Sequence, residues 1–328
     1  MRIFKRTIFT LLIILVVAIF GGYLFIKFKL PDTGAAPDIK VDMSQASLER
    51  GKYLVTNVSA CNVCHSKLDP SKFGLPIIES SMYGGGQIFD EKDGVPGRIV
   101  ASNITPYKLK TWTDGEIFRA ISSGVSKDGH ALFPLMPYHN YGHLSEDDIK
   151  SIVAYLRTVP EVKNDPQTTE LNFPVSLLVN TFPVKPSFQK IPDTTDKVAY
   201  GKYIITASAC MHCHSKDVKG SIPAGAEYAG GKEFIMPNGK VNSSNITPDK
   251  QTGIGNWTEE MFVRKFQQYD TSFIPYNVTK KINNGFNSPM PWLVYGKMKA
   301  VDIKAIYAYL QSLKPVKNSV IKYTPSSN

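Results

Sequence analysis

The residues with the clearest chemistry form a short pattern, Cys-x-x-Cys-His, that occurs twice. The copies are Cys61-Asn62-Val63-Cys64-His65 and Cys210-Met211-His212-Cys213-His214. Residues at i, i+3 and i+4 share one face of a helix, so two thiols and one imidazole would point the same way. Two such thiols can form thioethers with the vinyl groups of haem, while the histidine binds the iron. The pattern therefore predicts two covalently bound haem c groups. Their predicted ligands are Cys61, Cys64 and His65 in one copy and Cys210, Cys213 and His214 in the other.

A structural zinc site is the alternative use of these cysteines. Zinc ribbons place their two cysteine pairs about 15–20 residues apart, whereas 145 residues separate Cys64 from Cys210. Zinc binding also gives no reason for a histidine directly after each second cysteine. The two motifs use all 4 cysteines of the chain and leave none for disulfides. Haem attachment is therefore favoured, and it indicates an extracytoplasmic compartment.

The sixth ligand of each iron decides between electron transfer and catalysis, since an open position permits catalysis. No histidine follows His214, so a downstream ligand in the second copy would be one of the methionines Met236, Met261, Met290 and Met298. Met290 is favoured because the prolines on both sides stiffen its loop, and Met136 lies in a similar proline-rich loop of the first copy. Core packing is the alternative role of these two methionines. In the first copy three nearby histidines remain rivals: His130, His139 and His143.

A repeat positions both motifs. Gly-Lys-Tyr precedes each motif, Ser-Asn-Ile-Thr-Pro and Trp-Thr follow it, and Ala-Tyr-Leu closes each copy. From Met136 to Tyr155 and from Met290 to Tyr309 the distance is 19 residues in both copies. Such self-similarity predicts duplicated domains. Capping residues before apolar residues at helical spacing indicate helices, and the fold is expected to be all-α. These capping residues are Thr113, Ser145 and Thr258.

The first 30 residues predict a membrane anchor. Ile8 to Ile26 is a run of 19 residues without a charge, and about 20 apolar residues span a bilayer as a helix. A cleaved signal peptide is the alternative, with Gly34-Ala35-Ala36 as the nearest cleavage site. We favour an uncleaved helix in the bacterial inner membrane, with the haem-binding part on the periplasmic or extracytoplasmic side.

The predicted boundaries follow from these features. They are 1–30 for the anchor, 31–43 for a tether, 44–164 for the first cytochrome-like domain, 165–192 for a proline-rich connector and 193–328 for the second domain. The connector contains an apolar piece from Val175 to Val179, so we expect it to lie against the domains. The tail from Pro315 is expected to be loose.

Charge is distributed unequally between the copies. Residues 44–164 carry 13 basic and 13 acidic side chains, whereas residues 193–328 carry 17 basic and 10 acidic ones. Residues 275–328 hold eight lysines against the single acid Asp302. This excess predicts a docking face for an acidic redox partner, with a solvated lysine surface as the alternative. The candidate lysines are Lys280, Lys281, Lys297 and Lys299. No motif indicates nucleic-acid binding.

Together these motifs resemble tandem class I cytochrome c domains. Ser-Asn-Ile-Thr-Pro followed by Trp-Thr, with Leu-Ser-Glu-Asp-Asp before the last helix, is similar to the membrane-bound cytochrome subunits of bacterial alcohol and gluconate dehydrogenases. Those subunits usually carry three haem motifs, whereas this chain has two. The resemblance implies that the first and last helices of each domain cross, with Gly51 near Tyr155 and Gly201 near Tyr309.

The sequence therefore predicts a membrane-anchored dihaem protein that transfers electrons between a dehydrogenase or quinol-oxidising complex and a terminal acceptor. The alternative is a dihaem peroxidase, which would need one iron with an open or displaceable sixth position. The paired methionine loops argue against it. We expect an electron-transfer protein or a subunit of an oxidoreductase complex rather than a stand-alone enzyme.

Overall fold

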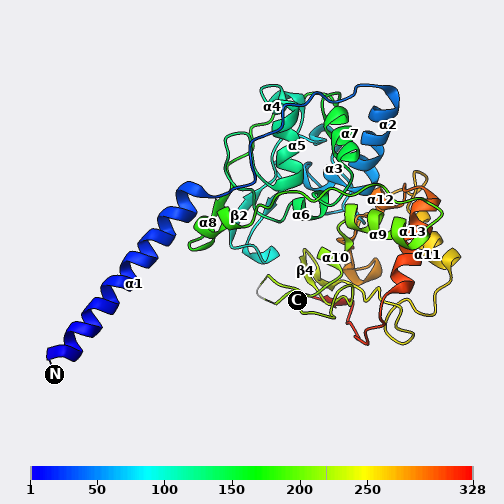
Figure 1. Ribbon diagram of the computed structural model, residues 1–328. Coiled ribbons are helices and arrows are strands. Elements are labelled where there is room, and N and C mark those ends of the chain that lie inside the picture. Colours follow the sequence, from blue (N-terminus) through cyan, green and yellow to red (C-terminus); the bar gives the residue numbers. More distant parts are fainter. Residues whose placement is uncertain (1, 219, 327–328) are drawn as a thin grey trace.

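The computed structural model describes residues 2–218 and 220–326, in which one long helix projects from a larger helical body (Figure 1). This helix, α1 (Arg2–Lys29), has no buried residue. It is the one helix in the described part of the chain that is long and apolar enough to cross a membrane. An isolated apolar helix with lysines at its end matches the length and composition of a membrane span.

The first half of the body contains the first Cys-x-x-Cys-His motif. Its elements are α2 (Gln45–Tyr53), η1 (Leu54–Val58), α3 (Cys61–Cys64), η2 (Glu79–Ser81), β1 (Ile88–Phe89), η3 (Glu91–Asp93), β2 (Gly97–Val100), α4 (Pro106–Leu109), α5 (Asp114–Ser123), α6 (Tyr138–Tyr141) and α7 (Glu146–Leu156). The predicted caps are present. Thr113 and Glu116 exchange the two hydrogen bonds of a capping box, and Ser145 accepts from the Asp148 amide.

A connector and a second half follow. Their elements are β3 (Glu170–Leu171), α8 (Val175–Leu178), η4 (Val179–Thr181), α9 (Lys197–Ala207), α10 (Cys210–Cys213), β4 (Glu233–Met236), β5 (Gly239–Asn242), α11 (Glu259–Gln267), η5 (Asn283–Gly285), α12 (Trp292–Tyr295), α13 (Ala300–Ser312) and β6 (Tyr323–Pro325). The connector lies against the first half, because the Ser187 amide donates to the Gly142 carbonyl and the Gln189 amide to the Leu144 carbonyl. The prediction that it packs is confirmed.

In each half the helix before the haem motif crosses the last helix at a glycine. A Cβ atom on Gly51 would lie 1.9 Å from the Ser151 carbonyl oxygen of α7, and one on Gly201 would lie 1.9 Å from the Ala305 oxygen of α13. Only glycine permits so close an approach. Tyr155 and Tyr309 are the neighbouring side chains in the two crossings, as the resemblance implied.

Two small sheets correct the expectation of a purely helical fold. Their strand orders are β1-β2-β3 and β4-β5-β6, and all pairs are antiparallel. The expected loose tail is also wrong, because Tyr323 pairs with Val241 as β6 joins β5. These strands are two to four residues long. They are too short to show the alternation that identifies a strand in a sequence.

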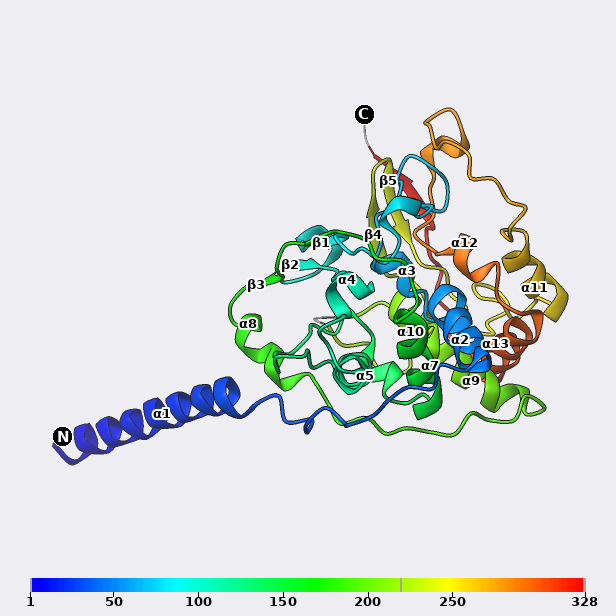
Figure 2. The same ribbon diagram turned by 90° about the horizontal axis from the view of Figure 1, so that it is seen from above.

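The two halves share a hydrophobic core. One cluster of buried side chains includes Leu54 and Ile149 from the first half and Ile204 and Ile303 from the second, all fully buried. Viewed from above, α2 and α7 lie beside α9 and α13 (Figure 2). The first and last helices of both halves therefore meet where the halves join, with Tyr53 bonded to Asp302 and Tyr203 to Asp148.

Candidate haem sites

The first motif forms a single helical turn. Cys61–Cys64 is α3, and the His65 amide donates to the Cys61 carbonyl at 2.9 Å. Ala60 directly before it has a left-handed backbone, with φ 51° and ψ 37°. The turn continues one hydrogen bond past the second cysteine, so both thiols and the imidazole come from the same turn, as predicted.

The second motif has the same geometry. Cys210–Cys213 is α10, the His214 amide donates to the Cys210 carbonyl at 2.8 Å, and Ala209 has φ 50° and ψ 31°. A non-glycine residue in this region costs about 1–2 kcal/mol, and such strain concentrates at functional sites. The same unusual conformation at equivalent positions indicates that both motifs are held for the same purpose.

A backbone carbonyl orients each motif histidine. His65 Nδ1 lies 2.7 Å from the Ser102 carbonyl oxygen, and His214 Nδ1 lies 2.8 Å from that of Ser244. A ring nitrogen that meets a carbonyl must carry the proton, so Nε2 keeps its lone pair for a metal. Burial lowers the pKa of both histidines, which favours the neutral form that binds iron.

This role explains the repeated Ser-Asn-Ile-Thr-Pro segment. Asn103 Nδ2 donates to the Val162 carbonyl, while its Oδ1 accepts from the Thr105 amide. Asn245 makes the corresponding bonds to Val316 and Thr247. The segment is therefore a braced loop that presents one carbonyl to each histidine. The repeat marked the segment in the sequence, but a carbonyl has no residue-specific signature that would reveal its role.

The four cysteines are free thiols in surroundings that disfavour the thiolate. Burial raises the pKa of Cys61 to about 12 and that of Cys64 to about 11, and it raises the pKa of Cys210 to about 12 and that of Cys213 in the same direction. Zinc binds the thiolate instead. Among the described residues, no group of three or more His, Cys, Asp or Glu side chains could hold a metal ion. Two thiols and an oriented imidazole on one helical turn fit the covalent attachment of haem c.

The two motifs are neighbours across the interface between the halves. The negative charge of a Cys213 thiolate would contribute to the raised pKa of Cys64, and both of these second cysteines are solvent-accessible although protein atoms surround them. Asn140 Nδ2 donates to the Thr206 carbonyl at 3.0 Å, and His212 Nε2 lies 3.0 Å from Asn140 Oδ1. The second cysteines therefore lie close enough for the charge of one to affect the other.

Each predicted methionine ligand lies two residues before a short helix, α6 or α12, that is hydrogen-bonded next to its motif. The Tyr138 amide at the start of α6 donates to the Met136 carbonyl, and the Trp292 amide at the start of α12 donates to that of Met290. Both methionines are partly buried against the core cluster. Each helix ends in a tyrosine that lies five residues after the methionine. Tyr141 donates to the Ser59 carbonyl and Tyr295 to that of Ser208, one residue before each left-handed alanine.

The rival side chains have other surroundings. His130 lies 2.6 Å from an Asp128 carboxylate oxygen, His139 Nε2 lies 2.8 Å from the Phe182 carbonyl, and His143 is exposed. Among the other methionines of the second half, Met298 is a core residue with 4% exposure, and Met261 is 43% exposed on α11. Met236 lies in strand β4. His139 lies within α6 itself.

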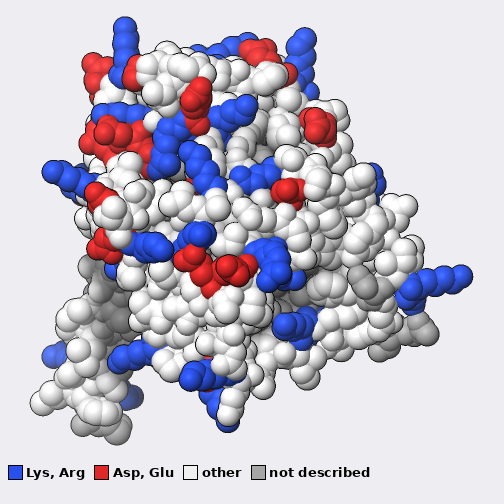
Figure 3. Space-filling view, turned by 90° about the vertical axis from the view of Figure 1, so that its right-hand side faces the viewer, with Lys and Arg blue, Asp and Glu red and all other residues white. Residues whose placement is uncertain are grey.

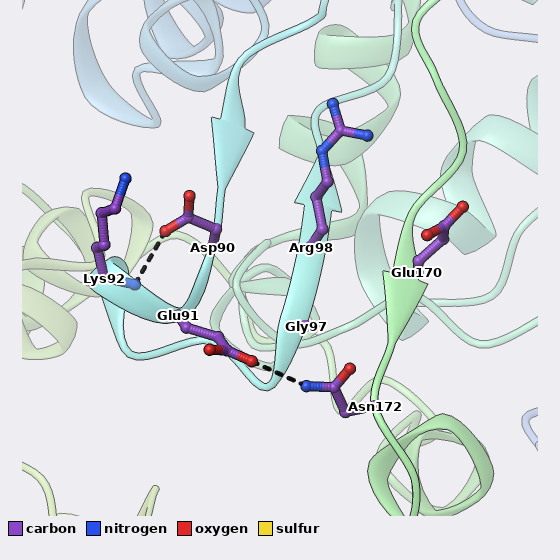
Figure 4. Close-up of a pocket in the computed structure, with 7 residues that line it drawn as sticks. All are labelled: Asp90, Glu91, Lys92, Gly97, Arg98, Glu170 and Asn172. Atoms are coloured by element: carbon purple, nitrogen blue, oxygen red, sulfur yellow. Dashed lines mark hydrogen bonds between the residues drawn. The ribbon is translucent and has the colours of Figure 1, made fainter.

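A separate hollow of about 410 Å³ lies beside the β1-β2-β3 sheet (Figure 4). It is lined mainly by charged and polar side chains, and two of its acids, Asp90 and Glu91, accept hydrogen bonds. Asp90 caps η3 by accepting from the Lys92 amide, and Glu91 accepts from Asn172. The lining includes none of the predicted haem ligands.

Comparison with known proteins places the second motif within a cytochrome c family model. Residues 198–314 match the family model of cytochrome c. The chain is 25% identical over 300 residues to the cytochrome c subunit of a quinone-dependent alcohol dehydrogenase from Gluconacetobacter polyoxogenes, covering 86% of this chain and 59% of that subunit. It is 26% identical over 244 residues to the gluconate 2-dehydrogenase cytochrome c subunit of Pantoea cypripedii, covering 69% and 52%. A dihaem c-type cytochrome of Cereibacter sphaeroides is 25% identical over 200 residues, covering 58% and 64%.

The predicted resemblance is thereby confirmed. The second half contains a cytochrome c domain, and the chain is similar to cytochrome subunits of alcohol and gluconate dehydrogenases. It spans between about half and three-fifths of the length of these subunits.

Proposed function

Since residues 198–314 form a cytochrome c domain, we propose that the chain is a membrane-anchored dihaem c-type cytochrome. It transfers electrons between a dehydrogenase or quinol-oxidising complex and a terminal acceptor. The observation that carries this proposal is that the two Cys-x-x-Cys-His motifs have the same local geometry. Both motifs combine a left-handed alanine, a cysteine turn and a histidine whose Nδ1 meets a serine carbonyl.

The chain's own residues would hold the two haems in equivalent ways. Cys61 and Cys64 would attach the first haem, and His65 would bind its iron. In the second site these roles fall to Cys210, Cys213 and His214. When bound, each haem supplies a one-electron change between ferrous and ferric iron. The protein orients the histidines, buries the groups and sets the separation of the sites.

Met136 and Met290 are the proposed sixth ligands. Each lies just before a short helix whose last residue, Tyr141 or Tyr295, is hydrogen-bonded next to the same motif. A thioether from either methionine would complete the ligand set of its iron and would raise the potential of that iron. A filled coordination sphere favours electron transfer over activation of peroxide. The relatives described above are dehydrogenase subunits and a dihaem cytochrome, so they do not support the peroxidase alternative.

We place residues 1–30 in the inner membrane as an anchor and 31–43 as a tether. Residues 44–164 and 193–328 are the two cytochrome c domains, and 165–192 connect them. The fully exposed apolar helix α1 supports the anchor. Covalent haem attachment supports a periplasmic or extracytoplasmic position for the body.

The excess lysines of the second domain are the proposed docking site for an acidic partner. Lys280, Lys281, Lys297 and Lys299 are all exposed. On the side of the molecule at the right of Figure 1, basic side chains lie among acidic ones (Figure 3). Docking would therefore depend on these four lysines rather than on a uniformly basic face.

Haem stoichiometry tests the proposal. The full chain, purified from membranes, should contain two covalently bound haems by pyridine haemochrome assay and intact mass. Cys64→Ser and Cys213→Ser serve as matched variants, because each should impair covalent attachment at one site and spare the other. A wild-type chain with one haem, or a Cys213→Ser chain with two normal attachments, would contradict the assignment.

A further inference from the structure

Two buried carboxylates join the halves of the molecule. Asp148 at the start of α7 is 2% exposed, and Asp302 at the start of α13 is 1% exposed. Asp148 Oδ2 accepts a 2.6 Å hydrogen bond from the hydroxyl of Tyr203, which belongs to the other half. Asp302 Oδ2 accepts from the hydroxyl of Tyr53, again from the other half. Each half thus contributes one tyrosine and one aspartate to a reciprocal pair of contacts.

The two tyrosines occupy equivalent positions, since both end the sequence Gly-Lys-Tyr. Each hydroxyl also accepts a hydrogen bond from a backbone amide at the start of the helix that carries its aspartate. The Ser145 amide donates to Tyr203 at 3.0 Å, and the Lys299 amide donates to Tyr53 at 2.9 Å. Both hydroxyls are therefore satisfied as donor and acceptor across the interface.

The buried setting keeps these hydroxyls as donors. Burial, followed by the neighbouring carboxylate, raises the pKa of Tyr53 and of Tyr203 well above the ordinary value. Deprotonation of either tyrosine would place its negative charge beside that of the aspartate it contacts.

The carboxylates have different partners within their own halves. Arg50 contacts Asp148 with two nitrogens, at 2.8 and 2.6 Å. At the equivalent position Tyr200 donates a 2.8 Å hydrogen bond to Asp302. Loss of the Tyr203 hydroxyl would thus leave Asp148 paired with Arg50. Loss of the Tyr53 hydroxyl would leave buried Asp302 with one fewer hydroxyl donor.

These contacts lie close in sequence to the haem motifs. Tyr53 ends α2, eight residues before Cys61, and Tyr203 lies in α9, seven residues before Cys210. The segments between them are themselves packed, because Leu54, Val55 and Ile204 are nearly fully buried. A displacement of either tyrosine would therefore be transmitted to its motif.

Resting on the proposed dihaem function, we propose that Tyr53 and Tyr203 are positioning residues for electron exchange between the two haems. By bonding Asp302 and Asp148 across the interface, they hold the two motifs at one separation and angle. The step they serve oxidises one ferrous iron and reduces the other ferric iron, so one electron moves and no bond changes. Its rate depends on the distance between the haems.

The test compares full-length chains that carry both haems. Tyr53→Phe and Tyr203→Phe, singly and together, remove only the hydroxyl groups. Tyr107→Phe and Tyr307→Phe are matched controls, because Tyr107 donates to Asp165 and Tyr307 to the Trp257 carbonyl without crossing between the halves. The measurements are the exciton couplet of the two haems in Soret circular dichroism and the inter-haem electron-exchange rate. Hydrogen exchange in α2 and α9 provides a readout independent of haem.

We expect the double variant to lose amplitude in the couplet, to exchange electrons several-fold more slowly and to show faster hydrogen exchange in both helices. Each haem should keep its own absorption spectrum, and the control variants should match the wild type. A double variant with two haems, an unchanged couplet and an unchanged rate overturns the proposal.

If the double variant does not accumulate in cells, two substitutions of Asp302 provide the test instead. Asp302→Asn keeps an oxygen that accepts from Tyr53, whereas Asp302→Leu does not. The couplet should be retained in the first and diminished in the second; equal couplets overturn the proposal. A wild-type chain with one haem would refute the dihaem function instead, so the two failures are distinguishable.

Discussion

Ala60 and Ala209 hold the backbone in the left-handed region directly before the two haem motifs. Their strain is balanced by neighbouring contacts. In each half a tyrosine of the methionine loop donates to the carbonyl of the preceding serine. A change in either loop should therefore affect the ligand it carries before it affects covalent attachment, which depends on the cysteines.

Replacement of Met290 by alanine tests the proposed ligand. Met290→Ala should leave both haems attached but lower the potential of one centre, on the order of 0.1 V, because a thioether ligand favours ferrous iron. Redox titration followed by optical spectroscopy would measure both potentials.

Met136→Ala is the matched variant and should lower the potential of the other centre. Met298→Ala controls for lost packing, since Met298 is a buried core residue. Two unchanged potentials in Met290→Ala would remove Met290 as a ligand.

The braced serine loops make a second prediction at this scale. Asn245→Ala removes the side chain that fastens the loop to Val316 and Thr247. The Ser244 carbonyl would then hold His214 less firmly. In other proteins, loss of the hydrogen bond that orients a metal-binding histidine weakens metal binding by about 10–100-fold. The His214-bound haem should show a broader and shifted absorption band.

Asn103→Ala should produce the same change at His65, with the other haem unaffected. An unchanged spectrum in both variants would mean that the serine carbonyls do not control the histidines.

At the scale of elements, the helix crossings are the tightest packing. A Cβ on Gly201 would meet the Ala305 carbonyl oxygen at 1.9 Å and Tyr309 Cβ at 3.0 Å. Gly201→Ala must separate α9 from α13, so we expect it to destabilise the fold by about 2 kcal/mol or more. Thermal unfolding of the haem-loaded chain in detergent would show a lower melting temperature.

Gly22→Ala is the control for helix propensity, because Gly22 lies in α1 with nothing within 4 Å of an added Cβ. It should not lower the melting temperature. A Gly201→Ala chain as stable as the wild type would contradict the observed crossing.

The sequence predicted these helices because their caps and apolar spacing are local. Thr113 and Ser145 cap the helices as expected, and the glycine crossings followed from the resemblance. The small sheets were missed since strands of two to four residues carry no periodic signal. The partners of Tyr53 were also hidden. Gly-Lys-Tyr showed that its position repeats, whereas Asp302 lies 249 residues away and only the folded chain brings the two together.

At the scale of the whole molecule, the shared core and the unequal charges have different consequences. Buried residues of both halves form one cluster, so neither half is expected to keep its structure when the other is removed. Charge, in contrast, lies on the surface and can be changed without disturbing this core.

Reversing three lysines tests the docking site. Lys280→Glu, Lys281→Glu and Lys297→Glu together should slow electron transfer to a small acidic copper protein at low salt and flatten the dependence of the rate on ionic strength. Lys299 is left unchanged because its ammonium lies 4.8 Å from the centre of the Tyr53 ring. Stopped-flow measurements across a salt series would record both effects.

Lys67→Glu, Lys92→Glu and Lys110→Glu form the matched control. These residues are exposed in the first half and change the net charge equally. An equal effect of the two triple variants would indicate net charge rather than a docking site.

The neighbouring positions of Cys64 and Cys213 set an order for the protein's biogenesis. The charge of one thiol affects the other, so both lie near the junction of the halves, which the tyrosine–aspartate contacts hold together. A haem-attachment enzyme needs access to each motif while its thiols are still free. We therefore expect both haems to be attached to an open chain, and the halves to close around them afterwards.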